Sequence, residues 1–159
     1  MIIEPAYGDD FKEVHALAER IEGIVGHPVH LYKILMDHFG DFFLVARIDG
    51  ETAGFQQGFP SVSREGAYFL WQVGVSPDFR KRGVASALVK ETEKVAASAG
   101  CTAVEATVET VNYASQGLFE SLGYVVASYG DTIEVEGKRA MPDFYGSGTD
   151  QILYKKSII

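Results

Sequence analysis

WQVGVSPDFRKRGVASALVKE, residues 71–91, is the stretch on which the predicted fold depends. It completes an apolar strand over Leu70–Val75, passes through a short turn and enters an amphipathic helix over Val84–Ala97. The first N–H groups of a helix have no partner within the helix, and the helix dipole favours negative charge there. Gly83 has no side chain to keep a ligand away from the backbone, and Arg80–Arg82 add positive charge beside it. These features together predict a binding site for a phosphate or pyrophosphate group.

The loop itself carries one of the known phosphate-binding patterns. The pattern G-x-x-x-x-G-K-[ST] does not occur, and G-x-G-x-x-G would need Gly74, which lies inside the predicted strand. What remains is R-x-x-G-x-A, formed by Arg80, Gly83 and Ala85 directly after the strand. It resembles the acetyl-coenzyme A loop of the GNAT superfamily of N-acetyltransferases, [QR]-x-x-G-x-[GA]. Its place between an apolar strand and a helix makes the resemblance specific.

Composition indicates one domain, residues 1–159, large enough to bury a core. The net charge of −8 disfavours nucleic acid and anionic membrane surfaces as partners. Against that background the basic run Arg80–Arg82 is an exception; such runs are usually solvated loops, but its place at a helix start favours a ligand. Cys101 is the single cysteine, so no internal disulfide can form, and its place after a helix end favours a buried thiol over a nucleophile. No signal segment opens the chain and no apolar run is long enough to span a bilayer, so we expect a soluble, cytoplasmic protein.

Apolar patterns and turn residues predict an α/β fold with a mixed, partly parallel sheet. Strands are predicted over residues 1–5, 42–48, 52–59, 67–75, 102–108, 124–135 and 151–157. Helices are predicted around residues 11–21, 31–39 and 84–97, with a last helix that begins at Asn112 and stops at Gly123. Asp49-Gly50 predicts a hairpin turn, and the almost continuously apolar 67–75 predicts a central strand covered on both faces.

A second pattern extends the GNAT resemblance over nearly the whole chain. In that family an Asn opens a late helix in the pattern N-x-x-[AS]-x-x-[LF]-[YF]-x-x-x-G-[FY], and the matching residues here are Asn112, Ser115, Leu118, Phe119, Gly123 and Tyr124. The resemblance implies a single acetyltransferase domain with a GNAT-like sheet that is splayed at its central strand and flanked by helices on both faces. Homodimers are frequent in the family, so a homodimer is a further expectation.

The resemblance also implies which groups bind acetyl-coenzyme A, the cosubstrate. Its pantetheine arm would pair with the backbone of Val73, Gly74 and Val75, and its pyrophosphate would bind the backbone of Arg80, Lys81, Arg82, Gly83, Val84 and Ala85. Asn112 and Phe119 would lie against the cofactor farther along the chain. Two plainer interpretations stand beside these: Gly74 as a packing notch or bulge, and Asn112 as a helix cap only.

A narrower resemblance concerns the amine acceptor. The segments YKILMDHFGDFFLVA, GFQQGF, FLWQVGVSP and VEATVETVN are similar to the diaminobutyrate acetyltransferases of ectoine synthesis. In those enzymes a Trp before the cofactor strand and an acid on the following parallel strand contact the diamine, and Trp71 and Glu105 match them. The His-and-acid cluster that precedes their last strand is replaced here by Gly148–Gln151. His27 and His30 lie near the loop expected to cover the acceptor and are weaker candidates, while the histidines as a set show no metal-ligand spacing.

Acyl transfer to an amine needs a group that accepts the proton of an ammonium whose pKa is roughly 10. Glu105 and Glu109 are the candidate carboxylates; they are four residues apart on a strand and so share a face, and Glu105 is the first choice. The alternative for either is a surface acid, the commoner fate of Glu. The backbone N–H of Val75 is the predicted donor to the oxyanion of the reaction.

The chain differs from the family at the position of the expected general acid. Phe119 stands where a Tyr often protonates the leaving thiolate, and a phenyl ring cannot donate. Tyr113 and Tyr124 are the nearby alternatives, and a thiolate with a pKa of about 8.5 can also leave unprotonated.

The function indicated is an acetyl-coenzyme A-dependent N-acetyltransferase that acts on the primary amine of a small molecule by direct transfer. The acidic surface suits a cationic acceptor of amino acid, diamine or polyamine type. Two alternatives remain open: an acyl-coenzyme A-binding regulatory module without catalysis, which Phe119 favours, and an acetyltransferase that acts on a protein or peptide.

Overall fold

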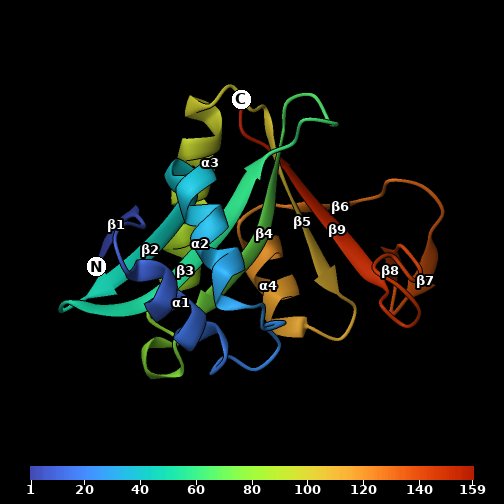
Figure 1. Cartoon of the computed structure of the whole chain (residues 1–159). Coiled ribbons are helices and arrows are strands. Elements are labelled where there is room, and N and C mark those ends of the chain that lie inside the picture. The colour runs from blue at the N-terminus through green and yellow to red at the C-terminus, as the bar shows by residue number, and fades with distance from the viewer.

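A seven-stranded sheet in the order β1-β2-β3-β4-β5-β9-β6 forms the centre of the computed structural model, which describes residues 1–159 (Figure 1). All neighbouring strands are antiparallel except β4 and β5, which run parallel. The strands of this sheet are β1 (Ile2–Pro5), β2 (Phe43–Ile48), β3 (Glu51–Pro60), β4 (Ala67–Val75), β5 (Ala103–Glu109), β6 (Val125–Ala127) and β9 (Gln151–Ser157). A separate two-stranded ribbon consists of β7 (Ile133–Val135) and β8 (Lys138–Ala140). The α-helices are α1 (Asp10–Ala18), α2 (Val29–His38), α3 (Val84–Ser98) and α4 (Tyr113–Ser121).

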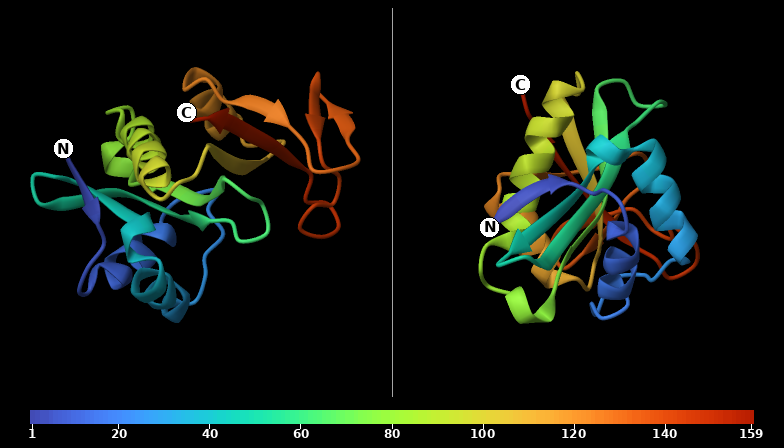
Figure 2. Two further views of the ribbon diagram at one scale, coloured as in Figure 1. Left: turned by 90° about the horizontal axis from the view of Figure 1, so that it is seen from above. Right: turned by 60° about the vertical axis from the view of Figure 1, so that its left-hand side comes forward.

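Helices cover both faces of the sheet, as predicted. Residues two apart on a strand share a face, but Ala53 is the extra residue of a bulge on β3, since the β2 register shifts from Ala46–Gly54 to Arg47–Thr52. Ala53 and Phe55 therefore enter different cores. Phe55 packs in the cluster that contains the buried residues of α1 and α2, whereas Ala53 packs with Val84 and Leu88 of α3. The view from above in Figure 2 shows α1 and α2 on one side of these strands and α3 on the other. Phe119 of α4 belongs to the cluster that α3 also enters, so both late helices share a face.

The parallel strands β4 and β5 pair over only three residues of each strand and then separate. Their registered pairs are Ala67–Ala103, Tyr68–Val104 and Phe69–Glu105. The remainder of β4, residues 70–75, stays paired with β3 on its other side but has no partner on β5. Trp71 is the extra residue of a bulge, because the β3 register shifts between Gln57 and Gly58. The predicted splay of the central strand is therefore present, and it starts at this bulge.

Most predicted element boundaries are within two residues of the observed ones, but the span 124–135 was wrongly predicted as one strand. It contains the short strands β6 and β7, which belong to different sheets, joined by a loop over residues 128–132. The loop contains Ser128, Gly130 and Asp131, whose types favour turns over strands. In the predicted helix 31–39, Tyr32 and Leu35 are buried, whereas Ile34 and Phe39 are exposed.

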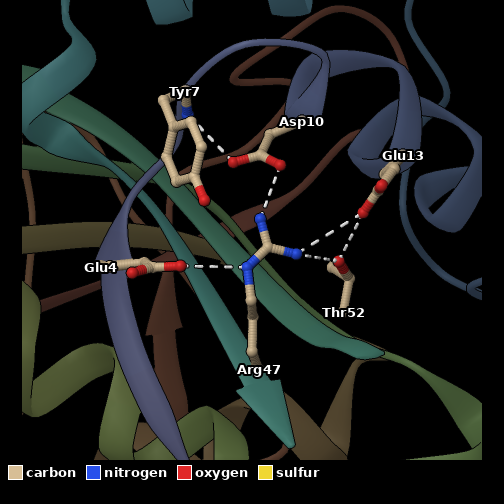
Figure 3. Close-up of polar contacts among 6 residues, drawn as sticks. All are labelled: Glu4, Tyr7, Asp10, Glu13, Arg47 and Thr52. Carbon is tan, nitrogen blue, oxygen red and sulfur yellow. Dashed lines mark hydrogen bonds and ion pairs between the residues drawn. The ribbon is translucent and has the colours of Figure 1, made fainter. Parts of the chain in front are cut away.

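A charged cluster ties the first strand and first helix to the β2–β3 hairpin (Figure 3). The Arg47 guanidinium donates to Glu4 Oε1 at 3.0 Å, to Asp10 Oδ1 at 2.5 Å and to Thr52 Oγ1 at 3.0 Å. The other oxygen of Asp10 accepts from the backbone N–H of Tyr7 at 2.9 Å. Burial lowers the pKa of Arg47, but its hydrogen bonds to the ionised Asp10 and Glu4 outweigh burial, so the pKa is raised. The cluster fixes the N-terminal segment and lies outside the site described below.

Two further findings concern single predictions. Cys101 is buried and free, as expected of a structural thiol, and burial raises the pKa of its thiol. None of the helices combines the length and the apolar character that crossing a membrane requires.

Candidate functional site

The start of α3 is an uncapped helix N-terminus with positive charge around it. Gly83, the N-cap residue, has φ +77° and offers no side chain to the first N–H groups of the helix. A Cβ at this position would meet no atom within 4 Å, so the left-handed backbone, and not crowding, is what requires glycine. The side chains of Arg80, Lys81 and Arg82 are exposed, and no carboxylate forms an ion pair with them. This arrangement can hold an anion on backbone N–H groups.

The free edge of β4 adds backbone donors in line with that helix start. The N–H of Ser76 donates to the carbonyl oxygen of Ala53 on β3 at 2.9 Å. N–H groups alternate between the two edges of an antiparallel strand, so those of Val73 and Val75 point away from β3, toward the side where β5 has separated. An extended chain placed there would find a ladder of unpaired backbone groups.

Gly74 is explained by packing. A Cβ at this position would lie 2.7 Å from the Ile24 side chain, 2.7 Å from the Phe55 ring and 2.9 Å from the Ile21 side chain. The glycine therefore lets the segment that joins α1 to α2 lie close against β4. The packing-notch interpretation is confirmed, and the bulge is at Trp71 instead.

The late-helix motif has its predicted cap. Asn112 is the N-cap of α4, and its Oδ1 accepts the N–H of Ser115 at 3.1 Å. Phe119 is buried, with its ring centroid 5.0 Å from that of Tyr124 and 5.8 Å from that of Tyr154. Both residues thus have structural roles, and their contact with a cofactor stays a prediction.

Glu105 is a buried carboxylate at the point where β4 and β5 begin to separate. It is 3% exposed and belongs to the last registered pair of the two strands. Lys155 Nζ on β9 lies 2.9 Å from Oε1, and the hydroxyl of Tyr129 donates to Oε2. A buried carboxylate needs such partners because leaving water is costly for an ion. Burial and the neighbouring Glu105 raise the pKa of the Tyr129 phenol, which keeps it protonated and able to donate.

Two adjacent cavities, of about 290 Å³ and 230 Å³, meet at Glu105. They share Arg64, Glu105 and Tyr129, and the larger one also contacts Lys155. The smaller one has aromatic walls contributed by Phe59, Phe69, Tyr129, Phe144 and Tyr145. Tyr145 is held by a 2.8 Å hydrogen bond between its hydroxyl and Thr107 Oγ1 on β5. A carboxylate beside aromatic walls is suited to hold an organic cation.

The other predicted acceptor and catalytic residues do not meet in these cavities. Trp71 packs against the α1–α2 core and lies 4.8 Å, centroid to centroid, from the ring of His27, and it lines neither cavity. Glu109 is exposed at the far end of β5. Tyr113 is exposed and its hydroxyl contacts Glu136, while Tyr124 is buried against Phe119.

Three residues of the site were missed by the sequence analysis: Arg64, Tyr129 and Lys155. Lys155 could have been found from strand pairing, because it stands directly opposite Glu105 in the β5–β9 register. Tyr129 was hidden by the wrong assignment of 124–135 as a strand, and Arg64 lies in a loop that carried no motif. No local pattern marks either of them.

Comparison with known proteins gives a family and a fold. The model of the "Acetyltransferase (GNAT) family" matches residues 8–124. "Acetyltransferase SG1711" of Sodalis glossinidius is 35% identical over 137 residues, which are 85% of this chain and 92% of that protein. Two solved structures share the fold. The diaminobutyrate acetyltransferase EctA of Paenibacillus lautus, solved with L-2,4-diaminobutyric acid and coenzyme A, has a TM-score of 0.77 at 23% identity, covering 98% of this chain and 93% of its own. A ribosomal-protein-alanine N-acetyltransferase of Brucella melitensis has a TM-score of 0.75 at 20% identity, covering 99% of each chain.

Proposed function

The chain belongs to the GNAT family of acetyltransferases, and from that premise we propose that it moves an acetyl group from acetyl-coenzyme A to the primary amine of a small molecule of amino acid, diamine or polyamine type. The observation that carries the proposal is the buried Glu105, which stands at the point where β4 and β5 separate and beside two small cavities. Glu105 thus lies between the free edge of β4, which suits the acetyl donor, and the cavities, which suit the acceptor.

The residues after β4 fit acetyl-coenzyme A. In our proposal the uncapped start of α3 at Gly83 holds the pyrophosphate on backbone N–H groups, and the side chains of Arg80, Lys81 and Arg82 supply positive charge nearby. The backbone of residues 73–75 pairs with the pantetheine arm, since the N–H groups of Val73 and Val75 face the side that β5 leaves free. When bound, the cofactor supplies an activated acetyl group as a thioester.

Glu105 is proposed to receive the proton of the acceptor's ammonium, directly or through one water molecule. Its Oε2 accepts one hydrogen bond, from Tyr129, and its Oε1 forms an ion pair with Lys155, whereas an ionised carboxylate has room for about four hydrogen bonds in total. Capacity for an ammonium or a water therefore remains on both oxygens. Glu109 is the weaker candidate, because it is exposed and lines neither cavity.

The proposed transfer is direct. The neutral amine nitrogen forms a bond to the acetyl carbon, the carbon–sulfur bond breaks, and the nitrogen loses its second proton to solvent as the amide forms. The departing thiolate of coenzyme A takes up a proton from solvent, so the protons balance. The N–H of Val73 donates to the carbonyl oxygen as negative charge develops there. The N–H of Val75, the donor predicted from the sequence, is the weaker candidate, because it lies six residues or about 20 Å along β4 from Phe69, the partner of Glu105. This arrangement needs no tyrosine at position 119.

Acetylation of a protein N-terminus is the second candidate, since the Brucella neighbour of the same fold is a ribosomal-protein-alanine N-acetyltransferase. The cavities of about 290 Å³ and 230 Å³ favour a small acceptor instead, because a small amine would fill a volume of this size. The experiment is a thiol-release assay with acetyl-coenzyme A, a panel of amino acids, diamines and polyamines, and a panel of peptides with free N-termini. Turnover with small amines alone supports the proposal; turnover with peptides alone overturns it.

A further inference from the structure

Arg64 is a cation in the acceptor site that has no partner of opposite charge. It belongs to the loop between β3 and β4, where its backbone N–H donates to Ser61 Oγ at 3.1 Å. No carboxylate forms an ion pair with its guanidinium, although the protein has eight more acidic than basic residues, 22 against 14. Arg64 is exposed, and its guanidinium is therefore not committed to the core or to a salt bridge.

The guanidinium is nevertheless held in one place. Its central carbon lies 3.3 Å from the centroid of the Tyr129 ring, which is a stacked cation–π contact. Tyr129 is in turn fixed by its hydrogen bond to Glu105. Stacking uses the face of the guanidinium and leaves its N–H edges free, and those edges match the two oxygens of a carboxylate. Arg64 lines both cavities, so the free edges belong to the site.

The charges around the smaller cavity are complementary to a zwitterion. Glu105 and Arg64 are its two charged wall residues, and the other walls are aromatic except for Ser61. Lys155, which pairs with Glu105 from the side of the larger cavity, adds a second positive charge close by. In the smaller cavity a polyamine would place its second ammonium near Arg64, where like charges repel, whereas in the larger cavity Glu65 offsets Lys155. A molecule with an ammonium at one end and a carboxylate at the other meets an opposite charge at both.

We propose that Arg64 binds a carboxylate of the acceptor, so that the preferred acceptor is an amino acid and not the diamine or polyamine of the same carbon chain. This inference rests on the proposed function and narrows it to one of the three acceptor types. The ammonium of the acceptor lies toward Glu105, the carboxylate lies toward Arg64, and the aromatic walls contact the carbon chain between them.

The test uses pairs of acceptors that differ only by the carboxylate: 2,4-diaminobutyrate against 1,3-diaminopropane, ornithine against putrescine, and lysine against cadaverine. With the wild-type enzyme, kcat/KM for the better amino acid exceeds that for its diamine by about tenfold or more, the usual effect of one hydrogen bond to a charged group. Arg64→Gln removes this preference, because it raises KM for the amino acid by about tenfold more than KM for the diamine, so that the ratio of the two kcat/KM values falls to about one. Arg64→Glu reverses the preference in favour of the diamine.

Arg139→Gln is the matched control. It removes one arginine from an exposed position on β8, outside both cavities, and keeps the wild-type preference. Equal kcat/KM values within every pair, or a preference that survives Arg64→Gln, would overturn the inference while leaving amine acetylation intact. If no amine is acetylated, the proposed function fails separately. Calorimetric titration of the coenzyme A-loaded protein with the same pairs then decides the role of Arg64: tighter binding of the amino acid that is lost in Arg64→Gln supports it, and binding that the substitution does not change refutes it.

Discussion

Replacing Glu105 by glutamine keeps the shape of a buried side chain and removes its charge. A positioned general base contributes about 10²- to 10⁴-fold to a rate, so we expect kcat/KM for the amine to fall by at least about 100-fold, or roughly 2.7 kcal/mol of barrier. Stability should change little, because the side chain of Lys155 is 47% exposed and its ammonium can return to water; a loss of about 1 kcal/mol is an upper expectation. The affinity for acetyl-coenzyme A should stay within about twofold of wild type, because the proposed cofactor contacts begin at Val73. Phe69, the residue of β4 that pairs with Glu105, lies four residues or on the order of 13 Å from Val73.

The assay is thiol release at saturating acetyl-coenzyme A, followed from pH 6 to pH 10. If Glu105 removes the ammonium proton, the deficit of the variant should shrink as the pH approaches the amine's pKa of roughly 10, because bulk water then supplies neutral amine. Glu93→Gln is the matched control. Lys156, the neighbour of Lys155 on β9, pairs with both oxygens of Glu93 at 2.9 Å, so this variant breaks a comparable ion pair outside the cavities.

A deficit that stays constant across this pH range would refute the general-base role of Glu105 and leave it as a residue that only positions others. A Glu105→Gln enzyme with a rate near that of wild type would remove Glu105 from the chemistry altogether. A larger loss in Glu109→Gln than in Glu105→Gln would move the proposed role to the exposed end of β5.

Two further predictions concern stability. Arg47→Gln leaves Asp10, whose side chain is only 9% exposed, without its cation, so urea unfolding should show a loss of about 3 kcal/mol in the free energy of unfolding. Adding Asp10→Asn in a double variant should restore part of that loss. A loss below about 1 kcal/mol in Arg47→Gln would contradict this account of the cluster. Burial raises the pKa of the Tyr68 and Tyr124 phenols, so they stay protonated in the folded chain while the unfolded chain ionises at about pH 10. The free energy of unfolding should therefore be unaffected by these groups below pH 10 and fall above it, by up to about 1.4 kcal/mol per pH unit for each phenol, and a stability that is flat between pH 10 and pH 11 would contradict the prediction.

The parts of the fold that the sequence predicts well are set by local chemistry. Strand β4 runs over the predicted residues 67–75, and α3 ends one residue beyond the predicted 97. Gly83 at the start of α3 and both residues of the Asp49-Gly50 turn have a positive φ. Because glycine adopts a positive φ most easily and Asp-Gly is a typical turn pair, these backbone conformations can be predicted from the residue types. Helices on both faces and the splay of the central strand followed from the family resemblance and are confirmed.

The acceptor site was only partly predictable because its residues come together through tertiary structure. Glu105 was identified from a resemblance, but its partners lie on β9, in the loop after β6 and in the loop between β3 and β4. Whether Lys155 faces Glu105 depends on a strand register that one residue of slip would reverse. Arg64 and Tyr129 meet only because both of their loops reach the end of the sheet where β4 and β5 still pair.

The central claim is that the start of α3 holds the diphosphate of acetyl-coenzyme A, and calorimetric titration of Gly83→Glu tests it most directly. Gly100→Glu is the control, because Gly100 follows the other end of α3 with φ +82° and open space around it, so both variants impose a similar backbone strain. The account predicts that Gly83→Glu weakens acetyl-coenzyme A binding by at least about 100-fold, as a carboxylate near a diphosphate should, while Gly100→Glu binds like wild type. Unchanged affinity in a folded Gly83→Glu protein would contradict the account.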